Sequence, residues 1–97
     1  MSKISVLIPA YNEELSLPEL YLKMKEETHS QYEWEILFIN DGSYDKTLEI
    51  IKSLRQQDNR INFVDLSRNF GKESAMLAGF DYATGDCVII MDADLQH

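Results

Sequence analysis

The stretch ISVLI at residues 4–8, ended by Pro9, is apolar or small throughout and rich in β-branched side chains. Such a run predicts a short buried β-strand. Further runs follow at residues 34–39, 61–66 and 87–91, of which the run at 61–66 is slightly more polar. Because strands that are apolar throughout need cover on both faces, we expect helices on both sides of the sheet.

A helix is predicted in each interval between two strands. The first begins at a capping box with Ser16 as N-cap, and Ser43 or Asp45 caps the second. The third spans residues 73–83 and ends at Gly85. The order βαβαβαβ with right-handed crossovers predicts an α/β fold, a Rossmann-like three-layer half-domain with a parallel sheet in the strand order 3-2-1-4.

The composition indicates one soluble domain: 97 residues, 44% hydrophobic and 27% charged, with a net charge of −8. Binding to nucleic acid is not expected, because such a surface needs a basic patch. The apolar runs are far shorter than the roughly 20 residues that span a bilayer, and no signal peptide is expected, because the first run meets Pro9. The lone Cys87 is interpreted as a buried residue of a protein in a reducing, cytoplasmic compartment.

Acidic side chains follow three of the predicted strands. Glu13 follows the first, Asp41 ends the second, and Asp92 and Asp94 follow the fourth. In an open parallel sheet, ligands bind outside the carboxyl ends of the strands, where the strand order reverses. We therefore expect these four carboxylates to converge on one crevice between the first and fourth strands.

The tripeptide Asp92-Ala93-Asp94 predicts a metal site. Residues two apart in an extended segment point to the same side, and two close carboxylates repel each other unless a cation lies between them. Mg²⁺ or Mn²⁺ prefers such oxygen ligands and shares its other positions with water and phosphates, and Gln96 could add a carbonyl oxygen. The alternative is that these acids are solvated loop or helix-capping residues.

The other polar residues at this edge allow two interpretations each. Asp41 either stabilises its own Asp-Gly-Ser turn or accepts an N–H of a nucleobase. Tyr11 and Glu13 either lead into the first helix or contact a base and its ribose. Arg68 and Lys72, the basic residues near the edge, are either surface charges or phosphate contacts.

Four segments closely resemble the family 2 inverting glycosyltransferases of GT-A fold: residues 5–14 (SVLIPAYNEE), 39–47 (INDGSYDKT), 66–72 (LSRNFGK) and 91–97 (MDADLQH). The runs RNFGK and DLQ point to the branch that contains dolichol-phosphate mannose synthase and bacterial polyprenyl-phosphate glycosyltransferases. The resemblance covers essentially the whole chain. G-x-G-x-x-G, Walker and G-x-S-x-G motifs are absent from the sequence.

The resemblance implies binding of a UDP- or GDP-sugar. The residues it assigns to the nucleotide sugar are Pro9, Tyr11, Glu13, Asp41 and Asp92. Asp92 and Asp94, the DXD motif, and Gln96 match the metal-binding positions for Mg²⁺ or Mn²⁺. In this family the metal stabilises the leaving diphosphate, and the acceptor, expected here to be a polyprenyl phosphate, inverts the anomeric carbon. No catalytic residue is assigned within this chain.

Family members carry an acceptor half after the acidic motif. Residues 1–97 are therefore expected to be the nucleotide-sugar-binding N-terminal part of a catalytic domain, inactive alone, without the acceptor half and any membrane helices. The full-length protein is expected at the cytoplasmic face of the membrane, in cell-envelope polysaccharide synthesis. An exposed fourth strand would favour self-association.

Two other functions fit parts of the sequence. The first is a non-catalytic nucleotide- or protein-binding module with the same fold, which metal-independent binding would indicate. The second, less favoured, is a nucleotidyltransferase. Such enzymes generally have a loop rich in glycine and basic residues after the first strand, whereas residues 9–14 (PAYNEE) contain no glycine and no basic residue.

Overall fold

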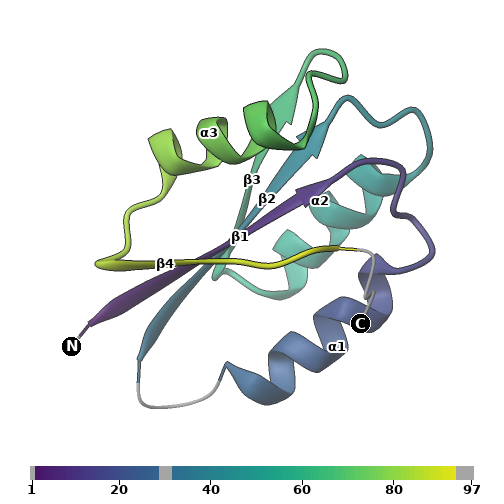
Figure 1. Cartoon of the computed structure of the whole chain (residues 1–97). Coiled ribbons are helices and arrows are strands. Elements are labelled where there is room, and N and C mark those ends of the chain that lie inside the picture. The colour runs from purple at the N-terminus through teal and green to yellow at the C-terminus, as the bar shows by residue number, and fades with distance from the viewer. Residues whose placement is uncertain (1, 29–31, 94–97) are drawn as a thin grey trace.

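The computed structural model describes residues 2–28 and 32–93. Its four parallel strands are β1 (Lys3–Ala10), β2 (Glu33–Asp41), β3 (Ile61–Leu66) and β4 (Cys87–Ile90), in the sheet order β3-β2-β1-β4. Helices α1 and α2 cover one face of the sheet and α3 covers the other (Figure 1). The predicted fold class, strand order and three-layer arrangement are confirmed.

The three helices are α1 (Leu17–Glu27), α2 (Thr47–Gln57) and α3 (Lys72–Tyr82). Helices α1 and α2 turn buried side chains toward the sheet, because their apolar residues recur at helical spacing, whereas α3 packs through the small residues Ala75 and Gly79. Among the described residues, no helix has the length and hydropathy needed to cross a membrane.

The starts of α1 and α2 match the predicted caps only in part. Ser16 is the N-cap residue of α1, but its hydroxyl donates to the Glu13 carboxylate (2.7 Å) and makes no capping bond. Lys46 precedes α2, and the Asp45 carboxylate accepts the Thr47 N–H at 2.9 Å. The capping bond predicted for Ser16 is therefore not made, whereas Asp45, one of the two residues predicted to cap the second helix, does accept the first N–H of α2.

The core lies on both faces of β1 and β2. Successive residues of β1 point to opposite faces, so that Val6 and Ile8 pack toward α1 and α2 while Leu7 packs toward α3. The small residues of α3 allow close packing: a Cβ at Gly79 would lie 2.9 Å from Ile39 Cδ1. The prediction of a sheet covered on both faces is therefore confirmed for the central strands.

For β4 that prediction is wrong within the described part of the chain. Ile89 and Ile90 are 41% and 45% exposed, and Cys87, interpreted from the sequence as buried, is exposed. The reason is position: β4 is an outer strand that pairs with β1, and the helices pack mainly over β1, β2 and β3. An apolar strand sequence does not distinguish an edge from a centre.

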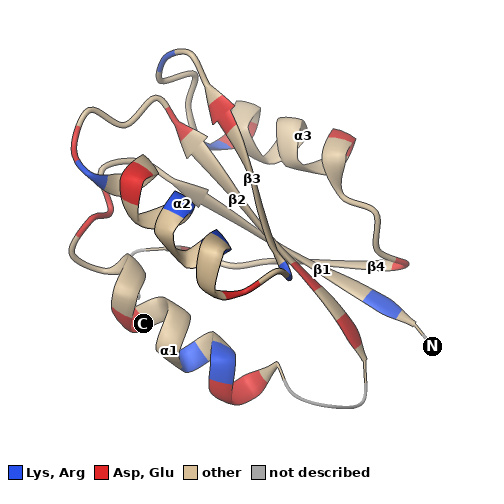
Figure 2. Ribbon diagram, turned by 180° about the vertical axis from the view of Figure 1, so that it is seen from behind, with Lys and Arg blue, Asp and Glu red and all other residues tan. Residues whose placement is uncertain are grey.

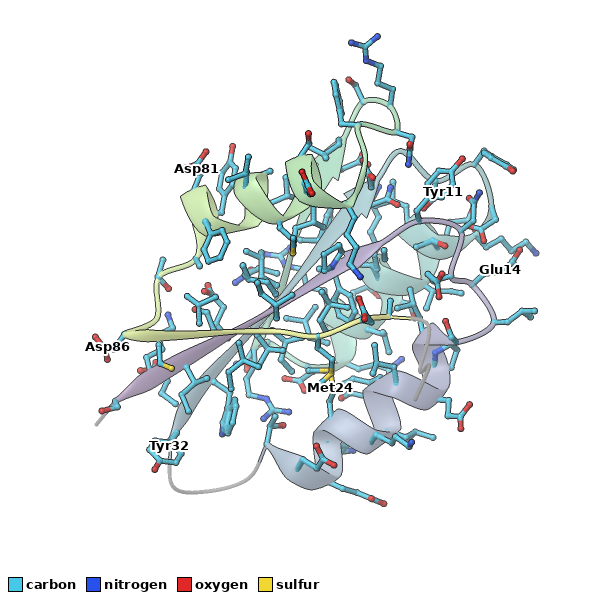
Figure 3. All side chains as sticks on the ribbon, viewed as in Figure 1. Tyr11, Glu14, Met24, Tyr32, Asp81 and Asp86 are labelled. Carbon is cyan, nitrogen blue, oxygen red and sulfur yellow. The ribbon has the colours of Figure 1, made fainter. Side chains whose placement is uncertain are left out.

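A buried carboxylate fixes the connection between α3 and β4. The Glu35 side chain accepts hydrogen bonds from Ser5 Oγ (2.8 Å) and from the Thr84 N–H (3.0 Å), and the Gly85 N–H donates to Ser5 Oγ (2.8 Å). A Cβ at Gly85 would lie 2.5 Å from Ser5 Oγ. Gly85 therefore permits a close approach to β1 and does not end α3, which stops at Tyr82. This network leads into Asp86, at the opposite end of the sheet from Tyr11 (Figure 3).

The same network sets the ionisation of Glu35. Burial by itself would raise the pKa of this carboxyl, but the hydrogen bonds from Thr84 and Ser5 and the charge of Lys3 outweigh it, so that the pKa lies below its ordinary value. A carboxyl with a lowered folded-state pKa stabilises the fold above its unfolded pKa of about 4.3, and the contribution disappears as the pH falls through the folded pKa.

Replacing Glu35 tests this network. Glu35→Gln should lower the free energy of unfolding at pH 7 by about 1 kcal/mol, because the charged acceptor of the Ser5 and Thr84 hydrogen bonds is lost. In urea unfolding, the difference from the original chain should shrink as the pH falls through the lowered pKa of Glu35, where this carboxyl becomes protonated. The control is Glu33→Gln, an exposed glutamate on the same strand. Parallel pH profiles for Glu35→Gln and the original chain would contradict the assignment.

The outer edge of β4 predicts self-association of residues 1–97. In the described residues no strand pairs with this edge, and unpaired backbone groups beside exposed isoleucines favour pairing with a second chain. Sedimentation velocity should show a mass that rises with concentration. Ile89→Lys should lower it, whereas Leu22→Lys, at an exposed leucine of α1, should not. A monomer at all concentrations would contradict this prediction.

Candidate functional site

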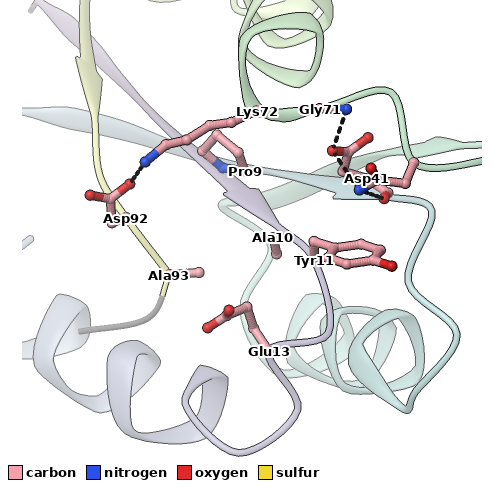
Figure 4. A pocket seen from close by; sticks show the side chains of 10 residues that line it. Pro9, Ala10, Tyr11, Glu13, Asp41, Gly71, Lys72, Asp92 and Ala93 are labelled. Atoms are coloured by element: carbon pink, nitrogen blue, oxygen red, sulfur yellow. Dashed lines mark hydrogen bonds and ion pairs between the residues drawn. The ribbon is translucent and has the colours of Figure 1, made fainter. Parts of the chain in front are cut away.

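A pocket of about 400 Å³ opens at the carboxyl ends of the strands (Figure 4). It lies between the ends of β1 and β2, the loop before α3 and the segment after β4. Its lining residues are Pro9, Ala10, Tyr11, Glu13, Asp41, Asn69, Gly71, Lys72, Asp92 and Ala93. The five residues that the sequence assigned to a nucleotide sugar are all among them, although their ligand roles stay predictions.

The register of the strands places the ends of β1, β2 and β4 side by side. Pro9 pairs with Ile39 across β1 and β2, and Leu7 pairs with Ile90 across β1 and β4. Asp92 therefore lies two residues beyond the last pair, beside the end of β1. Three of the four carboxylates predicted to converge, Glu13, Asp41 and Asp92, line one pocket, and the fourth, Asp94, lies outside the described residues.

Tyr11 lies at the pocket with a ring that is 41% exposed. The loop that carries it is held by Asn12, whose φ of 52° is in the left-handed region that asparagine tolerates. Asn12 donates its backbone N–H to Ser43 Oγ (2.9 Å) and accepts the Tyr44 N–H through Oδ1 (3.0 Å). The rings of Tyr11 and Tyr44 contact each other edge to face, with their centroids 6.1 Å apart. The loop after β2 therefore supports the Tyr11 side chain.

Glu13 is held through both its backbone and its side chain. Its N–H donates to Thr47 Oγ1 at the start of α2 (2.8 Å), and its carboxylate accepts the Ser16 hydroxyl. The side chain nevertheless lies at the pocket (Figure 4). Because a carboxylate has about four acceptor positions, Glu13 keeps capacity for ligand hydroxyl groups.

Asp41 has a role that neither sequence interpretation contained. Its side chain is buried and accepts three hydrogen bonds from the loop before α3: the Phe70 N–H (2.8 Å), the Gly71 N–H (3.0 Å) and Asn69 Nδ2 (3.1 Å). These bonds span about 30 residues of sequence, whereas turn chemistry would be local. Asp41 therefore anchors a distant loop, and through it Asn69 and Gly71 line the pocket.

Gly42 is required where the two loops touch. Its φ is +69°, and a Cβ there would lie 2.2 Å from both the carbonyl carbon of Arg68 and the nitrogen of Asn69. Only glycine fits such a close backbone approach. The sequence signal for this contact is the pair of runs NDGS and RNFG, but nothing in either run says that they meet.

Asp92, the last predicted ligand that the structure describes, forms an ion pair with Lys72 at the pocket (Figure 4). Both side chains are more than half exposed, at 55% and 58%. Asp94 and Gln96, the other predicted metal ligands, lie outside the described residues. Ala93 is 3% exposed and belongs to the same core cluster as Ile8 and Leu20.

The described donors fit part of a metal site. Residues 2–28 and 32–93 contain no cluster of three or more acidic, histidine or cysteine side chains that could hold an ion. Asp92 supplies one hard oxygen donor at the pocket, and an exposed ion pair such as its contact with Lys72 is weak enough to be replaced. This donor chemistry suits Mg²⁺ or Mn²⁺.

Removing the Asp41 carboxylate should release the loop before α3. Asp41→Ala leaves the Phe70 and Gly71 N–H groups without their acceptor, so unfolding should become easier by about 1–3 kcal/mol. Hydrogen exchange of both amides should accelerate more than that of β1. Asp81→Ala, at an exposed aspartate of α3, is the control. Unchanged exchange at residues 70 and 71 would show that Asp41 does not anchor this loop.

Comparison with known proteins gives consistent similarities. The profile described as "Glycosyl transferase family 2" matches residues 5–97. The chain is 50% identical over 95 residues to the putative glycosyltransferase CsbB of Bacillus subtilis (strain 168), covering 97% of this chain and 29% of that protein. It is 48% identical over 95 residues to the prophage bactoprenol glucosyl transferase homolog of Escherichia coli (strain K12), covering 97% of this chain and 31% of that protein.

Two solved structures share the fold. S. aureus TarS 1-349 in complex with UDP-GlcNAc superposes with a TM-score of 0.85 at 29% identity, covering 95% of this chain and 26% of that chain. The mannosyltransferase PcManGT from Pyrobaculum calidifontis, in complex with GDP-Man and Mn²⁺, gives a TM-score of 0.87 at 24% identity, covering 96% and 28%. The chain thus spans about three tenths of the length of the curated relatives that it matches.

Proposed function

The chain belongs to glycosyltransferase family 2, and from this premise we propose that its pocket binds a nucleotide-diphosphate sugar whose sugar is transferred to a polyprenyl-phosphate acceptor. The observation that carries the proposal is the convergence of Tyr11, Glu13, Asp41 and Asp92 on one pocket at the switch point of the sheet. Its volume of about 400 Å³ is within the range of small-molecule sites.

Each pocket residue has a chemistry that suits part of this ligand. The half-exposed ring of Tyr11 offers a face for a nucleobase, and the Glu13 carboxylate offers acceptors for ribose hydroxyls. Asp41, with three protein donors, has at most one acceptor position left for a base N–H, and Pro9 gives a rigid wall. Asp92 lines the same pocket, and in this proposal its carboxylate lies beside the diphosphate of the ligand.

The comparisons support the substrate classes. TarS is seen with UDP-GlcNAc and PcManGT with GDP-Man, so the proposed donor is a UDP- or GDP-sugar. Several relatives are named bactoprenol glucosyl transferases, which supports a polyprenyl-phosphate acceptor. We also propose that the reaction takes place at the cytoplasmic face of a membrane, in cell-envelope polysaccharide synthesis. Residues 1–97 would be the nucleotide-sugar-binding part of that catalytic domain.

We further propose that the reaction depends on Mg²⁺ or Mn²⁺. Asp92, with Asp94 and Gln96, would hold the ion, and the ion would neutralise negative charge on the leaving diphosphate. Support comes from the oxygen donor at Asp92 and from the Mn²⁺ in the PcManGT complex.

The proposed chemistry is a single displacement at the anomeric carbon. An acceptor phosphate oxygen forms the new bond from the face opposite the nucleotide, the bond to the diphosphate oxygen breaks with its electron pair, and the configuration inverts. A phosphate acceptor is already anionic near neutral pH, so this step requires no strong general base. The chain's own residues bind and orient the donor.

Calorimetric titration of the protein, as its gene encodes it, with UDP and with GDP tests the proposal. One of the two should bind at least tenfold more tightly with Mn²⁺ than without, and Asp92→Asn should remove most of that gain while leaving metal-free binding unchanged. Asp81→Asn is the matched control on exposed surface.

A nucleotide affinity that is the same with and without Mn²⁺ would favour the alternative, a non-catalytic nucleotide- or protein-binding module with the same fold. Transfer of labelled sugar from the preferred nucleotide to a polyprenyl phosphate then tests the reaction itself. Binding without transfer by the complete protein would contradict the proposed enzyme activity.

A further inference from the structure

Lys72 occupies a defined position at the pocket. It is the first residue of α3 and follows Gly71, whose N–H donates to the buried Asp41 carboxylate at 3.0 Å. Its side chain forms the ion pair with Asp92, which comes from the other side of the pocket, after β4 (Figure 4). The backbone at Lys72 is thus held in place, while its exposed ammonium group lies beside Asp92, the predicted metal ligand.

The charges of the pocket require a cation near the diphosphate. Three acids, Glu13, Asp41 and Asp92, line it, and Lys72 is the single basic residue among the described lining residues. A nucleotide diphosphate adds further negative charge, and the whole chain already has a net charge of −8. One divalent ion at Asp92 cannot neutralise both the remaining carboxylates and the diphosphate, so a second positive group is favoured.

The ion pair is exposed enough to exchange partners. Pairs of this kind shift equilibria by at most about fivefold, because water screens them. A phosphate oxygen offers an ammonium group a stronger, charge-assisted hydrogen bond. The dipole of α3 adds favourable potential for an anion beside its first residue.

We propose that Lys72 is a phosphate-binding residue of the donor site, which neutralises Asp92 in the empty pocket and moves to the diphosphate when nucleotide and cation bind. This proposal rests on the proposed function. It assigns to Lys72 the phosphate contact that the sequence left open. The donor diphosphate is favoured over the acceptor phosphate, because Lys72 shares its pocket with Tyr11 and Glu13, the residues suited to a nucleoside.

Comparing a diphosphate with its nucleoside in the protein as its gene encodes it tests the proposal. With Mn²⁺ present, Lys72→Gln should weaken binding of the preferred diphosphate, UDP or GDP, about tenfold. Binding of uridine or guanosine should not change, because a nucleoside carries no phosphate. Lys72→Arg should restore most of the loss. The control is Lys52→Gln, which removes the same charge from α2, a helix that carries basic residues (Figure 2). Lys52 is not among the residues that line the pocket.

Mn²⁺ alone gives a readout that does not depend on nucleotide or activity. Without nucleotide, Lys72→Gln should bind Mn²⁺ up to about fivefold more tightly by electron paramagnetic resonance, because Asp92 has lost its competing partner. Lys52→Gln should bind it as the original protein does. Unchanged Mn²⁺ affinity in Lys72→Gln would overturn the role of Lys72 as the counter-ion of Asp92.

The outcomes separate the two proposals. Equal losses for diphosphate and nucleoside would show a structural role and overturn the assignment, and so would an unchanged diphosphate affinity. A short-chain prenyl phosphate whose binding weakens while that of the diphosphate does not would place Lys72 at the acceptor and also overturn it. If the original protein binds neither UDP nor GDP, the proposed function itself fails, whatever the variants do.

Discussion

The buried carboxylate of Asp41 is the contact on which the pocket depends. It ends β2 and accepts three hydrogen bonds from residues 69–71, so that a loop following β3 is held against the end of the neighbouring strand. Gly42 makes the same junction sterically feasible, since any side chain there would overlap the backbone of Arg68 and Asn69. Without this junction, the start of α3 would have no fixed relation to the residues after β1, and the pocket would lose one wall.

A second carboxylate organises the other end of the sheet. Glu35 binds the Thr84 backbone and Ser5, and Gly85 lies directly against β1. These contacts set where β4 begins, and the pairing of Leu7 with Ile90 then sets where it ends. The position of Asp92 beside β1 is thus determined partly by residues at the opposite end of the sheet, because a parallel strand transmits its register along its length.

The charges of the pocket bear on how an acidic protein could bind the proposed diphosphate ligand. The pocket combines Glu13, Asp41 and Asp92 with one lysine, and its Asp41 is already satisfied by neutral N–H donors. In the same pocket, the exposed ammonium group of Lys72 pairs with the exposed carboxylate of Asp92. The negative charge of the proposed ligand would be balanced by an added cation and by Lys72, which pairs with Asp92 in the structure.

The sequence by itself determined the number and order of strands and helices, the parallel sheet, its strand order and the convergence of Glu13, Asp41 and Asp92, because apolar runs, helical spacing and crossover handedness are local or general rules. It also singled out Pro9 and Tyr11 through their resemblance to a family motif. Tertiary structure alone decided the rest. The exposure of Cys87, the loop-anchoring role of Asp41 and the pairing of Lys72 with Asp92 each depend on which distant segments become neighbours, and no local pattern records a contact between residues 20 or more positions apart.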